Sequence, residues 1–315
     1  MIVDVVCVGL SVVNFMVHPV DESIFSRDVT VVSPISMLQG GDAANQAIVL
    51  SKLGNKVALC SRRGTDMFGD IMLDLIAKYG IDIDVSGIAI DHDVGTSVCT
   101  VLIRPDGHRN FCVYKGAINN LCFEDIDLSI LEHAKVASVG GMFHFPVFDG
   151  EGMGKFFAYA RERGVITVAD TKLDIWGIGL EGVRKSLEHL DYFFPSYDEA
   201  AAISGETEPE KIAKVFLDAG VGHVGIKLGA DGCFMKDAKQ EFYTPGMSVD
   251  VVDTTGAGDN FMAGFITGLI KGLSLQECCK LGAAAGAICV SEVGANIAVK
   301  SFSQIQDFMS SNVTH

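Results

Sequence analysis

Asp253-Thr254-Thr255-Gly256-Ala257-Gly258-Asp259 is followed almost at once by an apolar helical segment, Phe261 to Ile270. A glycine-rich turn that enters a helix points successive backbone N–H groups at one spot, and the helix dipole adds positive potential there. A transferred phosphoryl group needs such an anion site. Asp259, in the first helical turn, can accept a proton from an attacking hydroxyl. We predict that Gly256, Ala257 and Gly258 form the anion hole and that Asp259 is the base, although a loose GxG pattern alone would indicate only a turn and a helix cap.

Elsewhere, short apolar runs alternate with helical patterns, which is typical of strand, helix, strand units around a mostly parallel sheet. The expected strands are Val3–Gly9, Val57–Ser61, Lys135–Gly140, Val165–Asp170, Tyr192–Phe194 and His223–Leu228. The expected helices are Ala43–Leu53, Phe68–Tyr79, Gly152–Arg163, Gly182–His189 and Pro209–Ala219, and the chain after Leu273 is helical in pattern to its end. These patterns predict an α/β fold.

Two segments break this alternation, about 12–37 and about 87–116, because they show turn residues and no helical period. In the second, Asp106-Gly107 separates two β-rich runs, a good hairpin signal. We expect both segments to form antiparallel strands of a small sheet over the active-site edge, a lid that is not an independent domain. Exposed strand edges in such a lid would allow pairing between two chains, so we also expect a homodimer formed through it.

The composition excludes several kinds of partner. The chain has 315 residues, with 24 Lys and Arg against 40 Asp and Glu, and a formal charge of −16. No run of Lys or Arg exceeds a pair, so binding to nucleic acid or to an anionic membrane surface is disfavoured. A hydrophobic fraction of 49% allows a large buried core, but no apolar run is long enough for a membrane span.

The cysteines and the start of the chain point to the cytoplasm. Nine cysteines without a CxxC pair are typical of free thiols in a reducing compartment. Residues 1–14 lack a basic leader and carry Asp4 within an apolar run, which favours a buried strand over a signal peptide.

Four sequence blocks resemble the signatures of the ribokinase (PfkB) family of carbohydrate kinases, and they occur along this chain in the same order as in the family. DTTGAGD at 253–259 resembles the C-terminal signature, and GGDAANQA at 40–47 resembles the N-terminal GGxxxN segment. GTDMFGD at 64–70 is similar to the GxDxxG segment, and KLGADG at 227–232 to the KxGxxG nucleotide loop. The resemblance covers essentially the whole chain. It implies one ribokinase-like kinase domain over residues 1–315, a three-layer α/β/α sandwich with a Rossmann-like, mostly parallel sheet and a small antiparallel β lid.

The resemblance also implies which residues bind the sugar. Gly40 and Gly41 would let the backbone approach the sugar closely, and the amide of Asn45 suits vicinal hydroxyls. Asp42 either binds hydroxyls as well or faces solvent at the start of the helix. The family usually has an Asp five residues after the glycine of its first strand, and Asn14 stands there, which loses a charge-assisted acceptor.

For the nucleotide, the resemblance implies that Gly229 and Gly232 let a loop lie against the phosphates of ATP, while Lys227 is either a phosphate contact or a strand-end lysine with a solvated tip. The segment FPSYDE at 194–199 resembles the NxxE segment, whose Glu organises the waters around Mg²⁺. Glu199 keeps that position, but Ser196 replaces the usual Asn.

The resemblance implies two further sites. Asp253, Thr255 and Gly294 stand at positions where many relatives bind a monovalent cation, so K⁺ is a further expected ion. Lys172 stands where many relatives have DxN followed by Arg; it either faces a phosphate or an anionic substrate group or lies on the surface.

The sequence therefore predicts an ATP- and Mg²⁺-dependent kinase for a hydroxyl of a small neutral sugar, such as ribose, fructose or another ketohexose. A nucleoside kinase would need an apolar clamp for the base. A phosphosugar kinase would need an extra anion site; Arg104, Arg109 and Lys115 lie in the expected lid, but the pattern does not say which face they occupy. The alternative outside the kinases is a sugar- or nucleotide-binding regulator without catalysis, which would have no need of Asp259.

Overall fold

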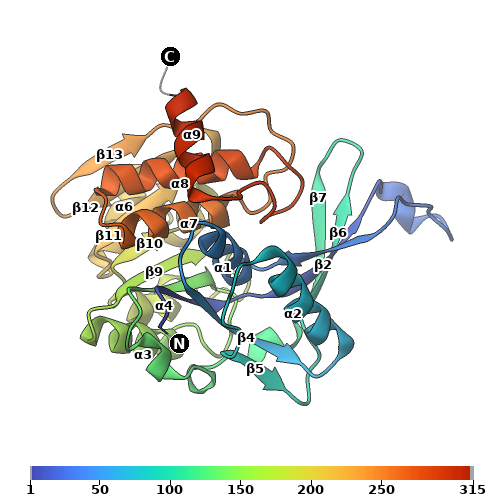
Figure 1. The fold of residues 1–315 in the computed structure, drawn as a ribbon, viewed down its shortest axis with the longest axis horizontal. Coiled ribbons are helices and arrows are strands. Elements are labelled where there is room, and N and C mark those ends of the chain that lie inside the picture. The colour runs from blue at the N-terminus through green and yellow to red at the C-terminus, as the bar shows by residue number, and fades with distance from the viewer. Residues whose placement is uncertain (1, 313–315) are drawn as a thin grey trace.

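The computed structural model describes residues 2–312, and most of these form a sandwich around one large sheet (Figure 1). Within these residues the sheet has nine strands, in the order β13 (Glu241–Thr244), β12 (Cys233–Asp237), β11 (His223–Lys227), β10 (Tyr192–Phe194), β9 (Ile166–Thr171), β8 (Val136–Met142), β1 (Val5–Gly9), β4 (Val57–Gly64) and β5 (Ile88–Asp91). The neighbours from β11 to β5 pair in parallel, whereas β12 and β13 are antiparallel additions at one edge.

Helices cover both faces of this sheet and make three layers. One core contains side chains of α3 (Glu151–Glu162), α4 (Gly179–Leu187), α5 (Tyr197–Ser204) and α6 (Pro209–Asp218). The other contains side chains of α1 (Asp42–Lys52), α2 (Met67–Tyr79), α7 (Ala257–Ile270), α8 (Leu275–Cys289) and α9 (Phe302–Asn312). Successive residues of β1 enter opposite cores, which is why this strand is apolar and buried throughout. The predicted three-layer α/β/α sandwich is confirmed.

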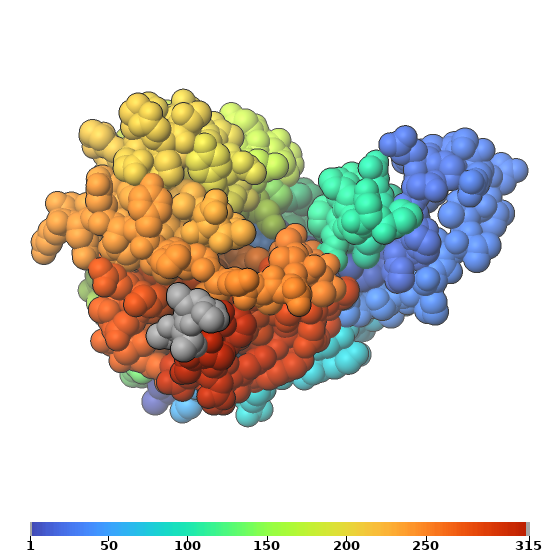
Figure 2. All heavy atoms as spheres, turned by 90° about the horizontal axis from the view of Figure 1, so that it is seen from above, coloured from blue at the N-terminus to red at the C-terminus, as the bar shows by residue number. Residues whose placement is uncertain are grey.

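A second, smaller sheet stands to one side of the sandwich (Figures 1 and 2). Its order is β3 (Ser36–Gly40), β2 (Val12–Val17), β6 (Val98–Ile103), β7 (Arg109–Tyr114). As expected, β2 with β3 and β6 with β7 are antiparallel pairs, and the two pairs meet through parallel β2 and β6. No helix within residues 2–312 is long and apolar enough to cross a membrane.

The structure corrects three details of the expected elements. β5, in the second expected lid segment, pairs with β4 in the large sheet, so the small sheet uses only the later part of that segment. The hairpin of β12 and β13 extends the large sheet although no strand was expected there. The chain after Leu273 is not helical throughout, because residues 290–301 form turns between α8 and α9, including Gly294 with a φ of 111°.

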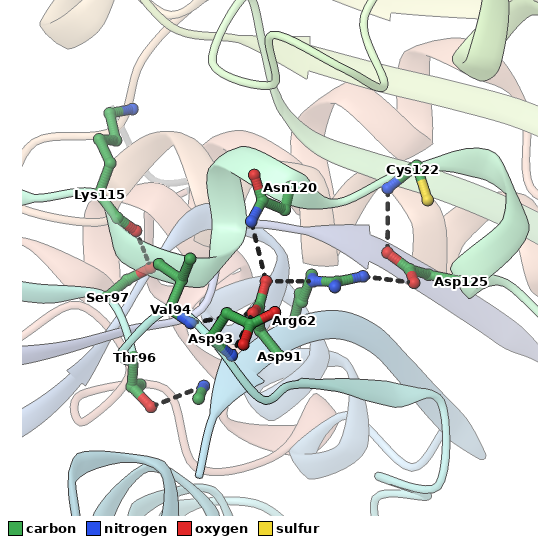
Figure 3. Close-up of polar contacts among 11 residues, drawn as sticks. Arg62, Asp91, Asp93, Val94, Thr96, Ser97, Lys115, Asn120, Cys122 and Asp125 are labelled. Atoms are coloured by element: carbon green, nitrogen blue, oxygen red, sulfur yellow. Dashed lines mark hydrogen bonds and ion pairs between the residues drawn. The ribbon is translucent and has the colours of Figure 1, made fainter. Parts of the chain in front are cut away.

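A polar network fixes the place where the chain leaves the large sheet for β6 (Figure 3). Arg62, near the end of β4, donates to Asp91 Oδ2 at 3.1 Å and to Asp125 Oδ1 at 2.6 Å. Asp91 also accepts from Asn120 Nδ2 at 2.9 Å. This hydrogen bond and those from the backbone of the following turn lower the pKa of Asp91 to about 2. A charged, hydrogen-bonded Asp91 therefore anchors one connection to the small sheet.

Candidate active site

The glycine-rich turn lies at the start of α7, as the sequence predicts. Gly256 has a φ of 78°, and a Cβ there would lie 2.4 Å from Cβ of Ala295, so only glycine fits. Among residues 2–312, no oxygen accepts a hydrogen bond from the backbone N–H groups of Gly258 and Asp259. These N–H groups and the dipole of α7 make a site for an anion.

The carboxylate of Asp259 is held in place by two side-chain amides. Its Oδ2 accepts a hydrogen bond from Asn45 Nδ2 of α1 at 2.8 Å. Asn45 Oδ1 in turn accepts from Asn296 Nδ2, in the loop after α8, at 2.9 Å. Asp259 is only 7% exposed. The amide of Asn45, expected to bind sugar hydroxyls, thus uses one hydrogen and its oxygen to orient the predicted base.

Asp259 belongs to a group of three buried carboxylates. The others are Asp42, at the start of α1, and Asp170, near the end of β9, and one oxygen of each lies within 4.8 Å of the others. Burial, and then the charges of Asp42 and Asp170, raise the pKa of Asp259 well above its usual range. Burial also raises the pKa of Asp170 to about 7, although Lys227 opposes it. This group can accept a proton, and its oxygens are the ligands that Mg²⁺ prefers.

Lys172 lies beside these carboxylates. Its Nζ is 2.9 Å from Asp42 Oδ1, and the Asp42 charge raises the pKa of Lys172. Asp42 is therefore buried and does not face solvent. The ammonium group of Lys172 contacts the Asp42 carboxylate, while its side chain remains 42% exposed.

A second lysine reaches this region from the small sheet. Lys115 directly follows β7, and its Nζ lies 2.6 Å from His144 Nδ1. Burial, and then the charge of Lys172, lower the pKa of Lys115 to about 8. Burial and the charge of Lys115 lower the pKa of His144 to about 3, so the imidazole is neutral.

Asn14, Gly40 and Gly41 lie together where β2 and β3 meet the sandwich. A Cβ on Gly40 would lie 2.2 Å from Asn14 Nδ2, and one on Gly41, which has a φ of 92°, would lie 2.6 Å from the carbonyl oxygen of Leu10. Position 41 therefore requires glycine, whereas a side chain at position 40 would displace the amide of Asn14. Within residues 2–312 the half-buried amide of Asn14 makes no hydrogen bond, so it is free to bind a ligand.

A cavity of about 590 Å³ opens beside the start of α7. The predicted nucleotide residues Lys227, Gly229 and Gly232 line it together with Ala257 and Gly258. Its size and its apolar wall next to an anion site suit a planar base joined to phosphates. The wall is formed by Met247, Val249, Val251, Phe261, Ala283, Ala287 and Val290.

Lys227 connects this cavity to the carboxylates. Its Nζ lies 3.7 Å from Asp170 Oδ2, and the side chain is 12% exposed. A Cβ on Gly258 would lie 3.1 Å from the same Nζ. The ammonium group is therefore buried at the start of α7, where it can bind phosphate oxygens, and is not the solvated tip of a strand-end lysine.

Two hydrogen bonds hold Glu199 beside the end of β9. Its Oε2 accepts hydrogen bonds from the N–H of Ser196 at 2.9 Å and from Thr171 Oγ1 at 2.8 Å. Ser196 therefore caps the N-terminus of α5 and holds Glu199 through its backbone N–H. Because Thr171 follows Asp170 in β9, the Glu199 carboxylate stands where it could contact the waters of a bound divalent cation.

Asp253 organises the loop before α7. Its Oδ1 accepts from the N–H of Thr255 at 2.8 Å, and its Oδ2 accepts from the N–H of Gly294 at 2.8 Å. Arg109 of β7 also pairs with Asp253 and donates to Thr255 Oγ1. The three residues expected to hold a monovalent cation thus come together, with a guanidinium group among them.

Sequence reasoning missed the site roles of Asp170, Gln46 and Asn296. Asp170 follows an expected parallel strand, and ligands of such sheets bind at the carboxyl ends of the strands, so that signal was present. Gln46, which donates to Asp170 Oδ2 at 3.0 Å, directly follows Asn45 in the predicted GGxxxN segment. Asn296 gave no signal, because its role depends on where the loop 290–301 folds.

The site combines N–H groups that can bind a phosphoryl group with a buried carboxylate that can accept a proton. Phosphotransferases use such an arrangement, since positioning and electrostatic stabilisation do most of their chemistry. The sequence comparison agrees with the geometry. Residues 3–301 match the family described as pfkB family carbohydrate kinase, and the chain belongs to this family.

Named relatives are sugar kinases. The chain is 26% identical over 287 residues to probable fructokinase-5 of Arabidopsis thaliana, covering 86% of this chain and 88% of the relative. It is 29% identical over 276 residues to ribokinase of Haemophilus influenzae, covering 86% and 87%. Among solved structures, a putative ribokinase II from E. coli in complex with ATP and Mg²⁺ superposes with a TM-score of 0.83 at 23% identity, covering 98% and 99% of the two chains. This last likeness concerns the fold.

Proposed function

We propose that this protein transfers the γ-phosphoryl group of ATP to a hydroxyl of a small sugar. The observation that carries the proposal is the position of the Asp259 carboxylate. It lies in the same helical turn as the N–H groups of Gly258 and Asp259, which have no acceptor within residues 2–312. A hydroxyl placed against Asp259 therefore also faces the anion site.

The reaction follows from this placement. Oδ1 of Asp259, which makes no hydrogen bond within residues 2–312, accepts the proton as the sugar oxygen attacks the γ-phosphorus. The bond from this phosphorus to the β,γ-bridging oxygen breaks, and ADP leaves. The N–H groups of Gly258 and Asp259 and the ammonium of Lys227 stabilise the charge on the phosphoryl oxygens. The N–H of Ala257, which was also expected in the anion hole, donates to the carbonyl oxygen of Thr254 at 3.3 Å.

ATP and Mg²⁺ fit the residues present. The apolar wall of the cavity suits the adenine, and Gly229 leaves room for the phosphates because a Cβ there would have no neighbour within 4 Å. Gly232 also lines the cavity, but a Cβ there would meet the backbone of Thr244 at 2.1 Å. Glu199 and the neighbouring carboxylates offer the oxygen ligands and water contacts that Mg²⁺ prefers. Bound Mg²⁺ would neutralise phosphate charge. K⁺ fits less well, because both carboxylate oxygens of Asp253 already accept hydrogen bonds.

The small sheet would act as the lid. Asn14 and Gly40 lie at its junction with the sandwich, beside the carboxylates, and Lys115 and Arg109 extend from it to the sandwich. Closure over the sugar would exclude water, which otherwise accepts the phosphoryl group.

A neutral sugar such as ribose or fructose is the first candidate substrate. Lys115 favours a second candidate, a sugar that carries a carboxylate or phosphate. Three cationic side chains of the expected lid, Arg104, Arg109 and Lys115, could bind an anionic group of the substrate. Arg104 pairs with Glu22 at 3.2 Å, and Arg109 pairs with Asp253. Within residues 2–312, Lys115 has only the neutral His144 as a side-chain partner. A half-buried ammonium without a counterion favours an anionic ligand.

An ADP-release assay with Mg²⁺ tests the proposal across ribose, ketohexoses, nucleosides, sugar acids and sugar phosphates. We expect one sugar to dominate, with mass spectrometry showing a single added phosphate. A dominant anionic sugar whose KM rises selectively in Lys115→Gln would establish the second candidate. Silence across the panel, with ATP binding confirmed, would contradict the kinase proposal and favour a binding regulator.

We also expect a homodimer through the small sheet, in the cytoplasm. The sheet exposes apolar side chains that a monomer seldom leaves bare, and Phe111 is 56% exposed. The other exposed apolar residues of this sheet are Met37, Val113 and Tyr114. Sedimentation should give a dimer for the wild type and a monomer for Phe111→Lys; a monomeric wild type would contradict the expectation.

All nine cysteines are free thiols, which agrees with a reducing compartment such as the cytoplasm.

A further inference from the structure

The hairpin of β6 and β7 reaches the glycine-rich loop through one side chain, Arg109. Its guanidinium contacts the Asp253 carboxylate and Thr255 Oγ1. The side chain of Arg109 is 13% exposed, and that of Asp253 is fully buried. In Figure 2 the hairpin (green) meets the segment that leads into α7 (orange). The contact joins the small sheet to the loop that shapes the anion hole.

This contact completes the bonding of Asp253. The Thr255 and Gly294 N–H groups donate to its two oxygens, and Arg109 adds a positive charge. Although burial raises the pKa of Asp253, the Thr255 N–H and Arg109 lower it overall, so the carboxylate stays charged. A buried carboxylate needs a counterion, and here the chain supplies it.

Two neighbouring carbonyl groups are also occupied. Asn260 Nδ2 donates to the carbonyl oxygen of Gly256 at 2.8 Å and to that of Ala295 at 2.6 Å. K⁺ binds through carboxylate and carbonyl oxygens stripped of water, and here the Asp253 carboxylate and the carbonyl groups of Gly256 and Ala295 already have N–H or guanidinium partners. The residues therefore do not fit the expected monovalent cation.

We propose that Arg109 takes the place of the monovalent cation, so that the small sheet supplies the charge that orders the anion-hole loop and catalysis does not depend on K⁺. Arg109 is a positioning residue: it acts through Asp253 on the turn at Gly256. Docking of the hairpin and completion of the anion hole are then one event, and phosphoryl transfer waits for closure of the lid. This inference rests on the proposed kinase function.

Two measurements test it. The first is kcat of the wild type with K⁺ or with choline at equal ionic strength, and we expect the two values to agree within about twofold. Arg109→Ala should lose roughly tenfold to a hundredfold in kcat, because the loop is misplaced, and should regain part of it with K⁺ or free guanidinium. Arg104→Ala removes a neighbouring hairpin cation whose partner is the exposed Glu22, and it should behave as the wild type.

The second measurement needs no catalysis. Hydrogen exchange of the Thr255 and Gly294 amides should accelerate severalfold in Arg109→Ala, and K⁺ should slow it again in the variant but not in the wild type. A severalfold rise of wild-type kcat with K⁺, or unchanged exchange in Arg109→Ala, would overturn the inference. Protection that depends on Arg109 in a protein inactive on every sugar would support the contact while contradicting the kinase function. If Arg109→Ala does not fold, the potassium response of wild-type kcat still tests the inference, as do the same measurements of kcat and hydrogen exchange on Arg109→Lys.

Discussion

Asn45 Nδ2 lies 2.8 Å from Asp259 Oδ2, although the two residues are 214 positions apart in the chain. The hydrogen bond joins the first glycine segment to the last, and Asn296 holds the far side of the same amide at 2.9 Å. An amide locked at its oxygen can present only its N–H₂ group to the carboxylate. The predicted base is therefore oriented by residues that do not need to touch the sugar.

Removing Asn296 should release this amide. In Asn296→Ala, Asn45 Oδ1 loses its partner and the amide can flip, so we expect kcat to fall roughly tenfold, equivalent to about 1.4 kcal/mol, with little change in KM for the sugar. Steady-state kinetics measures both. Asn55→Ala is the matched control, since Asn55 Nδ2 also joins the α1 region to α7, through Thr267 Oγ1 at 2.9 Å, but away from the site. A control with the larger loss of kcat would contradict this role of Asn296.

The three carboxylates predict that kcat/KM falls on the acid side of its pH profile at an unusually high pH. The base works only when deprotonated, and burial and its neighbours raise the pKa of Asp259, so kcat/KM should fall below a pH well above the usual range of an Asp. Asp170→Asn removes one like charge and should move this fall to lower pH. A pH profile of kcat/KM at saturating Mg²⁺ measures the shift. An identical fall in both proteins would contradict the electrostatic coupling.

Gly258→Ala should separate stability from activity. The added Cβ would lie 3.1 Å from Lys227 Nζ and push the ammonium from the anion site. Alanine is the better helix former by about 1 kcal/mol, so the protein should remain folded while kcat decreases. Thermal unfolding and kinetics on the same sample give both values. Wild-type kcat in this variant would show that Lys227 does not act at the start of α7.

Asp91 should make the connection between the large and the small sheet sensitive to acid. Its hydrogen bonds, first that from Asn120, lower its pKa from 3.8 to about 2 in the folded protein, so its stabilisation is complete above pH 3.8 and is lost as the pH falls toward 2. Asp91→Asn should lower the free energy of unfolding by about 1 to 3 kcal/mol at neutral pH. The difference from the wild type should shrink in acid, as urea titrations would measure. Asp93→Asn, at an exposed position in the same turn, is the control, and an equal loss there would refute the assignment.

The sequence was sufficient for the sandwich because its strands are buried on both faces. The run from Val5 to Gly9 has no polar residue, and only a strand between two layers of helices needs that pattern. β12 and β13 escaped prediction because they are short and carry polar residues such as Lys236 and Glu241, so that their pattern does not differ from that of a loop.

The site was predictable where one segment carries both the turn and its function. DTTGAGD contains the glycine with positive φ and the Asp259 carboxylate, so the start of α7 followed from sequence. The contact of Arg109 with Asp253 did not, because it depends on where a hairpin of one sheet meets a loop of another layer. Alternation within β7 gives two faces but not which of them meets the sandwich.

Asp259→Asn provides the most direct test of phosphoryl transfer at α7. Asparagine preserves the shape of the side chain and removes the proton acceptor, so turnover with the best sugar should fall by about a hundredfold or more while the Kd for ATP and Mg²⁺ stays within about threefold. Calorimetry and ADP release on the same preparation measure the two quantities. A variant that binds ATP normally and still phosphorylates the sugar at the wild-type rate would contradict the assignment of Asp259 as the base.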